Sequence, residues 1–481
     1  MTDTMRTLVH AAVALALACL VILTRPTLPK AAVFDEQGGA FYPEFSDPLA
    51  AAALDVTDYD ETSARTRQFN VVLKDGKWII PSKSNHPADA KDRLAKTAAA
   101  MIDLRKDAVR SDQAKDHELY GVVDPTEPGA SGAGRGARIT LRDAGGKILA
   151  DFVFGKPVKE KTGYRFVRRP GQKRVYEVKV PYEVSAKFSD WVETDLLQVS
   201  ASQIKKLILD SYTIDEAAER IRNQELNSLA KDDRGDWKLD SLAAGEELKK
   251  ESVDELVSAL DELKIVDVRR KPEELAKHFR SEKAQLKRSD LRDLAERGFY
   301  AAQGRLYANE GEMAAHSEDG VEYHLWFGEI VSDADDGKEL GKESRYLLIQ
   351  TRFDESAFPA VPEPKEVKED GTPKSDEEKR HDKEDYDYKK KEHDNKLEAG
   401  KKREQALARR FADWYYVISA DSFRKLRKTK VDLVKKPDVP KPEEKKSEEK
   451  KPEVKKPEEK KPPEKKAEEK KPETKKPEPK K

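Results

Sequence analysis

The sequence predicts an α+β fold of two tandem related units, each an antiparallel sheet with helices on one face. Three observations support this prediction: strand pairs joined by turn dipeptides, amphipathic helices between the pairs, and a second copy of the same order of elements. Neither half shows the strand–helix alternation of a doubly wound fold. We expect a membrane or signal segment over residues 1–30, units over 41–197 and 198–430, and a disordered tail over 431–481.

Length and charge narrow the classes of function. The 481 residues allow two or three domains, at roughly 150 residues per domain. The charged fraction is 39 %, so we expect part of the chain to lie outside any packed core. Lys and Arg number 93 against 94 Asp and Glu, and no basic domain stands out, which argues against nucleic acid as a partner. A single Cys excludes an internal disulfide framework and a Cys-based zinc site.

The N-terminal segment carries an almost unbroken apolar run, Leu8–Leu23. As a helix it would measure about 24 Å, slightly less than the hydrocarbon core of a bilayer, so we expect a short single-pass anchor in the bacterial cytoplasmic membrane. A cleaved signal peptide with Arg6 in its charged region and a lipoprotein bearing lipid on Cys19 are the alternatives. We expect most of the chain on the periplasmic side. A cytoplasm-facing orientation stays open, because charges flank both ends of the run.

The first unit begins with a hairpin signal. Gln68–Leu73 and Lys77–Ile80 are joined through Asp75-Gly76, a dipeptide typical of tight turns. A helix follows over Ala88–Leu104, with its apolar residues on one stripe. The later elements are the turn Tyr120-Gly121-Val122, the strands Ala137–Leu141, Ile148–Phe154, Tyr164–Val167 and Arg174–Val178, and a helix near Glu183–Trp191.

The second unit repeats this order. Leu207–Leu209 opens it, and the strand at Trp237 matches the strand at Trp78. Its helix carries apolar residues at spacings of three and four. The remaining elements are that helix at Val253–Leu263, the turn Arg297-Gly298-Phe299, the strand Tyr323–Phe327 running into Gly328 as Phe154 runs into Gly155, the strands Arg345–Ile349 and Tyr415–Ile418, and the helix Phe423–Leu426.

Three low-complexity segments interrupt the chain. They are the Gly-rich loop Pro128–Gly136, a charged insertion at about 359–403, and the Lys/Glu/Pro-rich tail, whose residues 441–481 hold 17 Lys and 12 Glu. Such segments bury too little apolar surface to offset the entropy of ordering the chain. We therefore expect all three to be solvated and without fixed structure.

This order of elements resembles the domain-of-unknown-function family 4340. The residues that carry the resemblance are Phe41–Phe45, Lys74–Pro81, Glu118–Pro125, Phe154-Gly155-Lys156 and Val175–Val178. It covers residues 41–200 well and 201–430 more loosely, and it rests on turn and core residues. The resemblance implies a membrane-anchored bacterial envelope protein, accessory to an ABC-type transport system or a gliding-like system. It implies no catalytic residue.

Motifs that carry chemistry are weak in this sequence, and we assign no catalytic, cofactor-binding or metal-binding residue. Gly129–Gly136 precedes a strand and lacks the order of a phosphate loop. Asp333–Gly337 misplaces the glycine and lacks the last ligand of a calcium loop. His381 and His393 lack metal-ligand spacing, and His117 has no second His four residues on.

Four aromatic residues, Trp78, Trp237, Trp326 and Tyr176, fall on expected strands and are assigned to the core in preference to a ligand groove. We expect a non-enzymatic, membrane-anchored envelope protein that acts as a scaffold or binding module. Its partners would be the membrane, through residues 8–23, and transporter components or other envelope proteins. The alternative is an exported hydrolase whose carboxylates the sequence does not single out.

Overall fold

The computed structural model describes residues 37–435 except 62–63, 130–131, 182–183, 219, 281–285, 332–342 and 369–371, together with Met5, His10 and residues 12–17. Within these described residues, no helix is long and apolar enough to cross a membrane. The expected anchor over residues 8–23 lies mostly outside the described residues. So do the loop at Asp333–Gly337 and the tail from residue 436 onward.

The fold is α+β with antiparallel sheets, as the sequence predicts. The first sheet has nine strands in the order β4-β3-β2-β1-β6-β7-β8-β9-β5. Their bounds, in chain order, are β1 Ala53–Asp60, β2 Arg65–Lys74, β3 Lys77–Ile80, β4 His86–Pro87, β5 Ala108–Ser111, β6 Ala137–Arg142, β7 Ile148–Pro157, β8 Tyr164–Arg168 and β9 Val175–Lys179.

The second sheet has eight strands in the order β12-β11-β10-β17-β18-β19-β20-β14. Their bounds are β10 Ile204–Asp215, β11 Arg220–Lys231, β12 Trp237–Leu239, β14 Ile265–Arg270, β17 Glu312–Ser317, β18 Val321–Ile330, β19 Arg345–Phe353 and β20 Trp414–Ile418. Two small ribbons accompany it, β13 Glu247–Leu248 with β21 Val434–Lys435, and β15 Phe299–Ala302 with β16 Arg305–Ala308.

The two strand orders correspond position by position. Reading β1, β2, β3, β5, β6, β7, β8 and β9 as β10, β11, β12, β14, β17, β18, β19 and β20 converts the first order into the second, apart from the extra edge strand β4. The chain visits the strands in the same sequence in both sheets. Registers agree as well: Phe154 pairs with Val167 on β8, and Phe327, 173 residues later, pairs with Leu347 on β19.

An amphipathic helix covers the same face of each sheet. α3 (Lys91–Ile102) and α5 (Lys250–Asp261) lie in the chain between the third strand of their sheet and its far edge strand. Their buried stripes, such as Leu94 and Met101 on α3 or Leu256 and Leu260 on α5, belong to the main hydrophobic core with the inward residues of the strands. We call this the inner face of each sheet and the opposite one the outer face.

The expectation of helices on one face alone is wrong. Small hydrophobic clusters also form on the outer faces, around Val122 after α4 (His117–Tyr120) in the first sheet. On the second sheet, α6 (Glu273–Arg280), α7 (Arg288–Ala295) and β15–β16 build a larger outer cluster. The polar sequence between residues 271 and 310 conceals this layer, because each of its helices buries few side chains.

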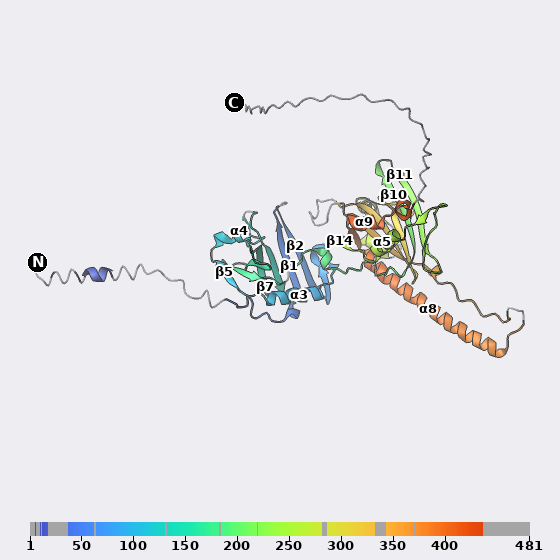
Figure 1. The fold of residues 1–481 in the computed structure, drawn as a ribbon, viewed down its shortest axis with the longest axis horizontal. Helices are drawn as coiled ribbons and strands as arrows, with labels where there is room; N and C mark the ends of the chain where they lie inside the picture. Colours follow the sequence, from blue (N-terminus) through green and yellow to red (C-terminus); the bar gives the residue numbers. More distant parts are fainter. Residues whose placement is uncertain are drawn as a thin grey trace, which may run out of the picture. The chain divides into compact units, whose positions relative to one another are not determined.

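The expectation that the charged insertion lacks fixed structure is also wrong. Residues Asp376–Ala412 form one helix of 37 residues, α8, drawn in orange in Figure 1. A capping box of Ser375 and Glu378 begins it, and acidic residues in its first turn complement the helix dipole. Ion pairs four residues apart, such as Lys389 with Asp385 and Lys396 with Glu392, stabilise the helix without a core.

Only the C-terminal part of α8 packs on the sheet. Leu407 and Phe411 join the main core, whereas residues 376–399 are exposed or half-buried, and we call residues 376–396 the arm. Lys271, 3 % exposed, donates through Nζ to the carbonyl oxygens of Phe411, Ala412 and Trp414 at 3.1, 3.1 and 2.7 Å. This lysine therefore holds the C-terminal end of the helix, whose last carbonyls lack partners within the helix.

Two other boundaries differ from the sequence prediction. The described part of the helix expected near Glu183–Trp191 contains a single 3-10 turn, Phe188–Asp190. The expected tail begins five residues too early, because α10 (Lys430–Leu433) and β21 pack on the body, with Leu433 fully buried. The closing helix is confirmed as α9, Ala420–Leu426.

Candidate binding site on the second sheet

A glycine on each sheet lets a turn pass against the outer face at the same place. A Cβ atom on Gly155 of β7 would lie 2.4 Å from the carbonyl oxygen of Tyr120, and one on Gly328 of β18 would lie 2.3 Å from that of Arg297. No side chain fits at either distance, so glycine is required there for its lack of a Cβ. The turns at Gly121 and Gly298 therefore cover equivalent places on the two outer faces.

The hydrophobic clusters under these turns differ in residue size. Val153 stands two positions before Gly155, and Trp326 stands two positions before Gly328. Both side chains point to the outer face of their sheets. Phe299 and Tyr415 stack with ring centroids 5.9 Å apart and planes within 5°. The matching members of the two clusters are Val122 with Phe299, Val153 with Trp326, and Val175 with Tyr415.

On the outer face of the first sheet, a network of ion pairs and hydrogen bonds lies beside the valines, and its charged groups all have partners. Asp151 accepts from Arg138 Nη2 at 2.7 Å and from Thr140 Oγ1 at 2.9 Å. Arg138 also donates to Asp124 at 3.1 Å. The hydrogen bonds to Asp151 raise the pKa of Arg138, which is thus cationic throughout the physiological range. Every member of this network has a partner of opposite charge or a hydroxyl.

The same positions on the second sheet line a cavity of about 820 Å³. By register, Glu312 replaces Arg138 opposite the aromatic residue, and His324 replaces Asp151 two positions before it. The cavity has an apolar side and a polar side. Its apolar side is formed by Phe279, Leu286, Leu294, Leu306 and Trp326, and its polar side by Arg305, Glu312, His324, Gln350 and Arg352.

Two buried polar atoms in this wall have no hydrogen-bond partner among the described residues. They are Nε1 of Trp326, a residue only 4 % exposed, and Nδ1 of His324. The two rings are neighbours, with centroids 5.0 Å apart. Buried polar groups of native proteins normally have hydrogen-bond partners. Two neighbouring polar atoms without partners at a cavity therefore point to a binding function.

The hydrogen bond of His324 with Glu322 sets the chemistry of its ring. His324 Nε2 lies 2.8 Å from Glu322 Oε1, and this bond is the main cause of the lowered pKa of Glu322. Glu322 therefore stays a carboxylate that accepts a hydrogen bond from Nε2–H. In the neutral imidazole Nδ1 is then the bare acceptor, next to a bare donor on Trp326.

One of the two arginines that line the cavity, Arg305, is already neutralised. Arg305 Nη2 lies 3.2 Å from Asp210 Oδ2 and also pairs closely with Glu312. These carboxylates raise the pKa of Arg305, although its partial burial opposes the rise. The guanidinium therefore fixes the floor of the cavity more than it attracts an anion.

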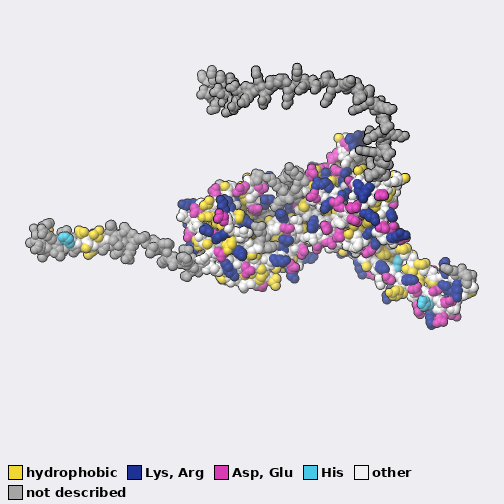
Figure 2. All heavy atoms as spheres, in the orientation of Figure 1, with side chains coloured by type: hydrophobic (Ala, Val, Ile, Leu, Met, Phe, Trp, Pro, Cys, Tyr) yellow, Lys and Arg dark blue, Asp and Glu magenta, His cyan; other side chains and the backbone are white. Residues whose placement is uncertain are grey.

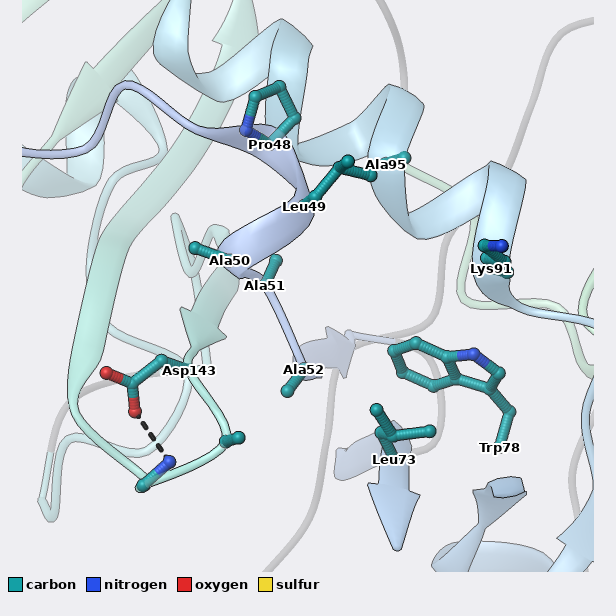
Figure 3. Close-up of a pocket in the computed structure, with 12 residues that line it drawn as sticks. Pro48, Leu49, Ala50, Ala51, Ala52, Leu73, Trp78, Lys91, Ala95 and Asp143 are labelled. Atoms are coloured by element: carbon teal, nitrogen blue, oxygen red, sulfur yellow. Dashed lines mark hydrogen bonds between the residues drawn. The ribbon is translucent and has the colours of Figure 1, made fainter. Parts of the chain in front are cut away.

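A second cavity, of about 600 Å³, lies on the first sheet (Figure 3). Leu49, the alanines of residues 50–52, Leu73 and Trp78 supply an apolar lining. Its one carboxylate, Asp143, accepts from the backbone nitrogens of Gly145 and Lys147, both at 2.9 Å, and so serves the turn between β6 and β7. Apart from Lys91, which also lines it, this groove offers mainly apolar surface.

The aromatic residues assigned to the core from sequence divide into two kinds. Trp326 and Tyr176 are buried, as expected, at 4 % and 3 % exposure. Trp78 and Trp237 are half-buried; Trp78 lines the groove of Figure 3, and Trp237 lies under the ammonium group of Lys231 at 5.1 Å. Two of the four aromatic residues are therefore buried as predicted, and the other two are only half-buried.

The histidines considered as ligands lie apart from one another. His117 Nε2 bonds the carbonyl oxygen of Lys173 at 2.8 Å, and His393 on α8 lies against Phe358. His381 is exposed on the arm. In the part of the chain that the structure describes, no group of three or more His, Cys, Asp or Glu is arranged to hold a metal ion.

Sequence reasoning did not single out His324, Glu322 or Gln350. A signal for them exists in β18, where the inward residues Val321, Tyr323 and Leu325 alternate with the outward Glu322 and His324. Alternation alone marks such residues as solvent-facing. Their burial depends on α6, α7 and the β15–β16 ribbon, which arrive from elsewhere in the chain.

Comparison with known proteins identifies one family. The model described as "Domain of unknown function (DUF4340)" matches residues 78–283. This range runs from β3 of the first sheet to just beyond α6 of the second, and it lies inside the residues 41–430 over which the resemblance was read. No curated protein and no solved structure matches the chain.

Proposed function

Because residues 78–283 belong to the DUF4340 family, we propose that the chain is a non-enzymatic, membrane-anchored envelope protein built from two related units and serving as a binding module. The observation that carries the proposal is the contrast between the two outer faces. Strand order and register agree, yet one face is closed by ion pairs and the other holds a cavity with unpaired polar atoms. A duplicated scaffold with one altered face is suited to binding.

The arm of α8 supplies a second surface for a partner. Residues 376–387 carry seven acidic and three basic side chains, and residues 388–403 carry three acidic and seven basic ones. Charges of both signs cover the visible surface of this helix in Figure 2. Such a surface favours fast, salt-sensitive association with a protein of complementary charge. A transport or gliding-like complex of the envelope is the partner we propose.

The proposed location is the bacterial cytoplasmic membrane, with residues 37–435 on its periplasmic side. The apolar run Leu8–Leu23 supports it, since it is near the length that spans a bilayer. A reporter that is active only outside the cytoplasm, fused after residue 436, tests the orientation. Activity of a cytoplasmic reporter at the same place would contradict it.

An exported hydrolase is the competing function, and the His324–Glu322 pair favours it, since an imidazole held by a carboxylate can serve as a general base. A nucleophile or an activated water beside His324 Nδ1 would complete such a site. Turnover of ester, amide or glycoside substrates that disappears in His324→Gln would establish the enzyme and overturn the binding module.

Crosslinking in native membranes followed by affinity capture tests the binding role. We would compare the full chain, a chain ending at residue 436, and a full chain with Lys389, Lys390 and Lys391 changed to Glu. Recovery of the same membrane complex with the first two chains, and a loss with the charge-reversed arm, is the expected result. A matched control reverses Lys425 on α9, an exposed lysine away from the arm. Recovery of no specific partner with any chain would overturn the proposal.

A further inference from the structure

We infer that the cavity on the outer face of the second sheet binds a saccharide, an inference that rests on the binding role proposed above and names its ligand class. The site is defined by Trp326 and His324 on β18, Gln350 on β19 and Arg305 on β16. The argument uses the hydrogen-bonding character of these groups together with the shape of the walls.

The two unpaired atoms are complementary to a ligand group that both donates and accepts hydrogen bonds. Trp326 Nε1–H can only donate, and His324 Nδ1 can only accept while Nε2–H is held by Glu322. A hydroxyl group satisfies both, because it carries one donor and two lone pairs. An ionised carboxylate has acceptors alone and would leave Nδ1 of the neutral His324 ring without a donor.

Neighbouring groups extend the same preference over several hydroxyls. Gln350 stands directly opposite His324 in the pairing of β18 with β19 and offers both an amide donor and an amide acceptor. Arg305 and Glu312, held in a mutual ion pair, add planar donors and acceptors. A polyhydroxylated ring presents its hydroxyls in just such an alternating pattern. A simple apolar ligand would leave all of these groups desolvated without compensation.

Apolar side chains in the lining suit the carbon skeleton of a sugar ring. Phe279, Leu294 and Leu306 contribute apolar surface to the cavity. The volume of about 820 Å³ lies within the range of about 300–1,000 Å³ that small-molecule sites occupy. Mixed walls and this volume suit a short oligosaccharide better than an isolated ion.

Charge supports a neutral ligand. Arg305 is bound to two carboxylates, Asp210 and Glu312, so its positive charge is already compensated. Glu322 adds a negative charge beneath His324. The first sheet shows the contrast, because there Arg138 and Asp151 occupy the matching positions and pair with each other. On the second sheet Glu312 and His324 pair with Arg305 and Glu322 instead, and His324 Nδ1 has no partner among the described residues.

Isothermal titration of the full chain tests the inference, in a detergent without a sugar headgroup. The probes are maltotriose and triacetylchitotriose. We expect at least one to bind, and we expect Trp326→Phe, which keeps an aromatic ring but removes the donor, to weaken that affinity about tenfold. Gln350→Leu, at a half-buried position, should weaken it as well. Trp78→Phe on the first sheet is the matched control and should bind as the unchanged chain does.

Three outcomes would overturn the inference. One is no binding of either saccharide at about 10 mM, a concentration well above typical dissociation constants for specific sites. Another is unchanged saccharide binding in both folded variants, which would place the site elsewhere. The third is binding of octanoate, an amphiphilic anion, without binding of either saccharide. Because the membrane complex is captured in a separate experiment, its recovery alongside any of these results would leave the proposed binding role standing.

Discussion

The outer faces of the two sheets have the same backbone arrangement but differ in the side chains that cover it. Each has a turn packed against a glycine, Gly155 of β7 or Gly328 of β18, and a hydrophobic cluster beneath it that contains three matching positions. In the first sheet the cluster is three valines beside a closed ion network. In the second it is three aromatic residues beside a cavity.

This difference teaches that two sheets with the same strand order can share their backbone constraints while their side chains differ. The glycines persist because a Cβ would strike a carbonyl oxygen in either copy. The residues Asp151 and His324 are free to differ, because only their local partners must match. Variants at these matched positions therefore test the comparison directly.

Replacing either glycine should have the largest effect. We expect Gly328→Ala and Gly155→Ala each to lower the free energy of unfolding by about 4 kcal/mol, because the new Cβ would force the turn away from the strand. Chemical denaturation of the two variants measures it. Gly145→Ala, whose nearest atom is Asp143 Oδ1 at 3.3 Å, is the control and should change stability by less than about 0.5 kcal/mol. A tolerant Gly328 beside an intolerant Gly155 would break the equivalence.

Exchanging the aromatic residue for its valine counterpart comes next. Trp326→Val should cost about 3 kcal/mol, since the buried ring leaves a void in the outer cluster. The half-buried Trp237, changed to Val, should cost about 1 kcal/mol. Thermal unfolding followed by circular dichroism compares them. Equal losses at the two sites would mean that the aromatic cluster contributes no more than a surface ring.

Lys271, which packs on the second sheet, should make the stability of the protein depend on pH. Burial lowers the pKa of this lysine to about 7, below its value of about 10.4 in the unfolded chain. Between these values the unfolded chain binds more protons, so the contribution of Lys271 makes the protein more stable as pH rises from 7 toward 10, by about 3 kcal/mol. Chemical denaturation at pH 7 and at pH 10, of the unchanged chain and of Lys271→Met, measures the contribution of Lys271 to this rise in stability. A variant with the same rise in stability as the unchanged chain would contradict the assignment.

The smallest effect is expected at the start of the arm, which the first sheet lacks. Ser375→Ala removes the side-chain cap that accepts from Glu378 N and should cost about 1 kcal/mol of local helix stability. Amide hydrogen exchange over residues 376–396 reports it. Lys383→Ala, on an exposed part of the same helix, serves as the control. Faster exchange in both variants alike would mean that the cap has no special role.

Much of the fold was predictable because it depends on local patterns. Turn chemistry and periodicity predict the hairpin at Asp75-Gly76 and the apolar stripes of α3 and α5. They also predict that Gly155 and Gly328 hold equivalent positions. The arm was missed because composition was weighed without its order. Its Glu–Lys spacings and capping box stabilise a helix even though the same composition forms no core.

The sequence by itself determined the antiparallel α+β class, the order of the elements and the match of residues 78–283 to the DUF4340 model, since each depends on residues close together in the chain. Only the tertiary structure decided the candidate site. Trp326, His324 and Gln350 come from two neighbouring strands, whereas Phe279 and Arg305 come from a helix and a ribbon that fold over them. Burial and the loss of hydrogen-bond partners are properties of that assembly, and no single segment of sequence contains them.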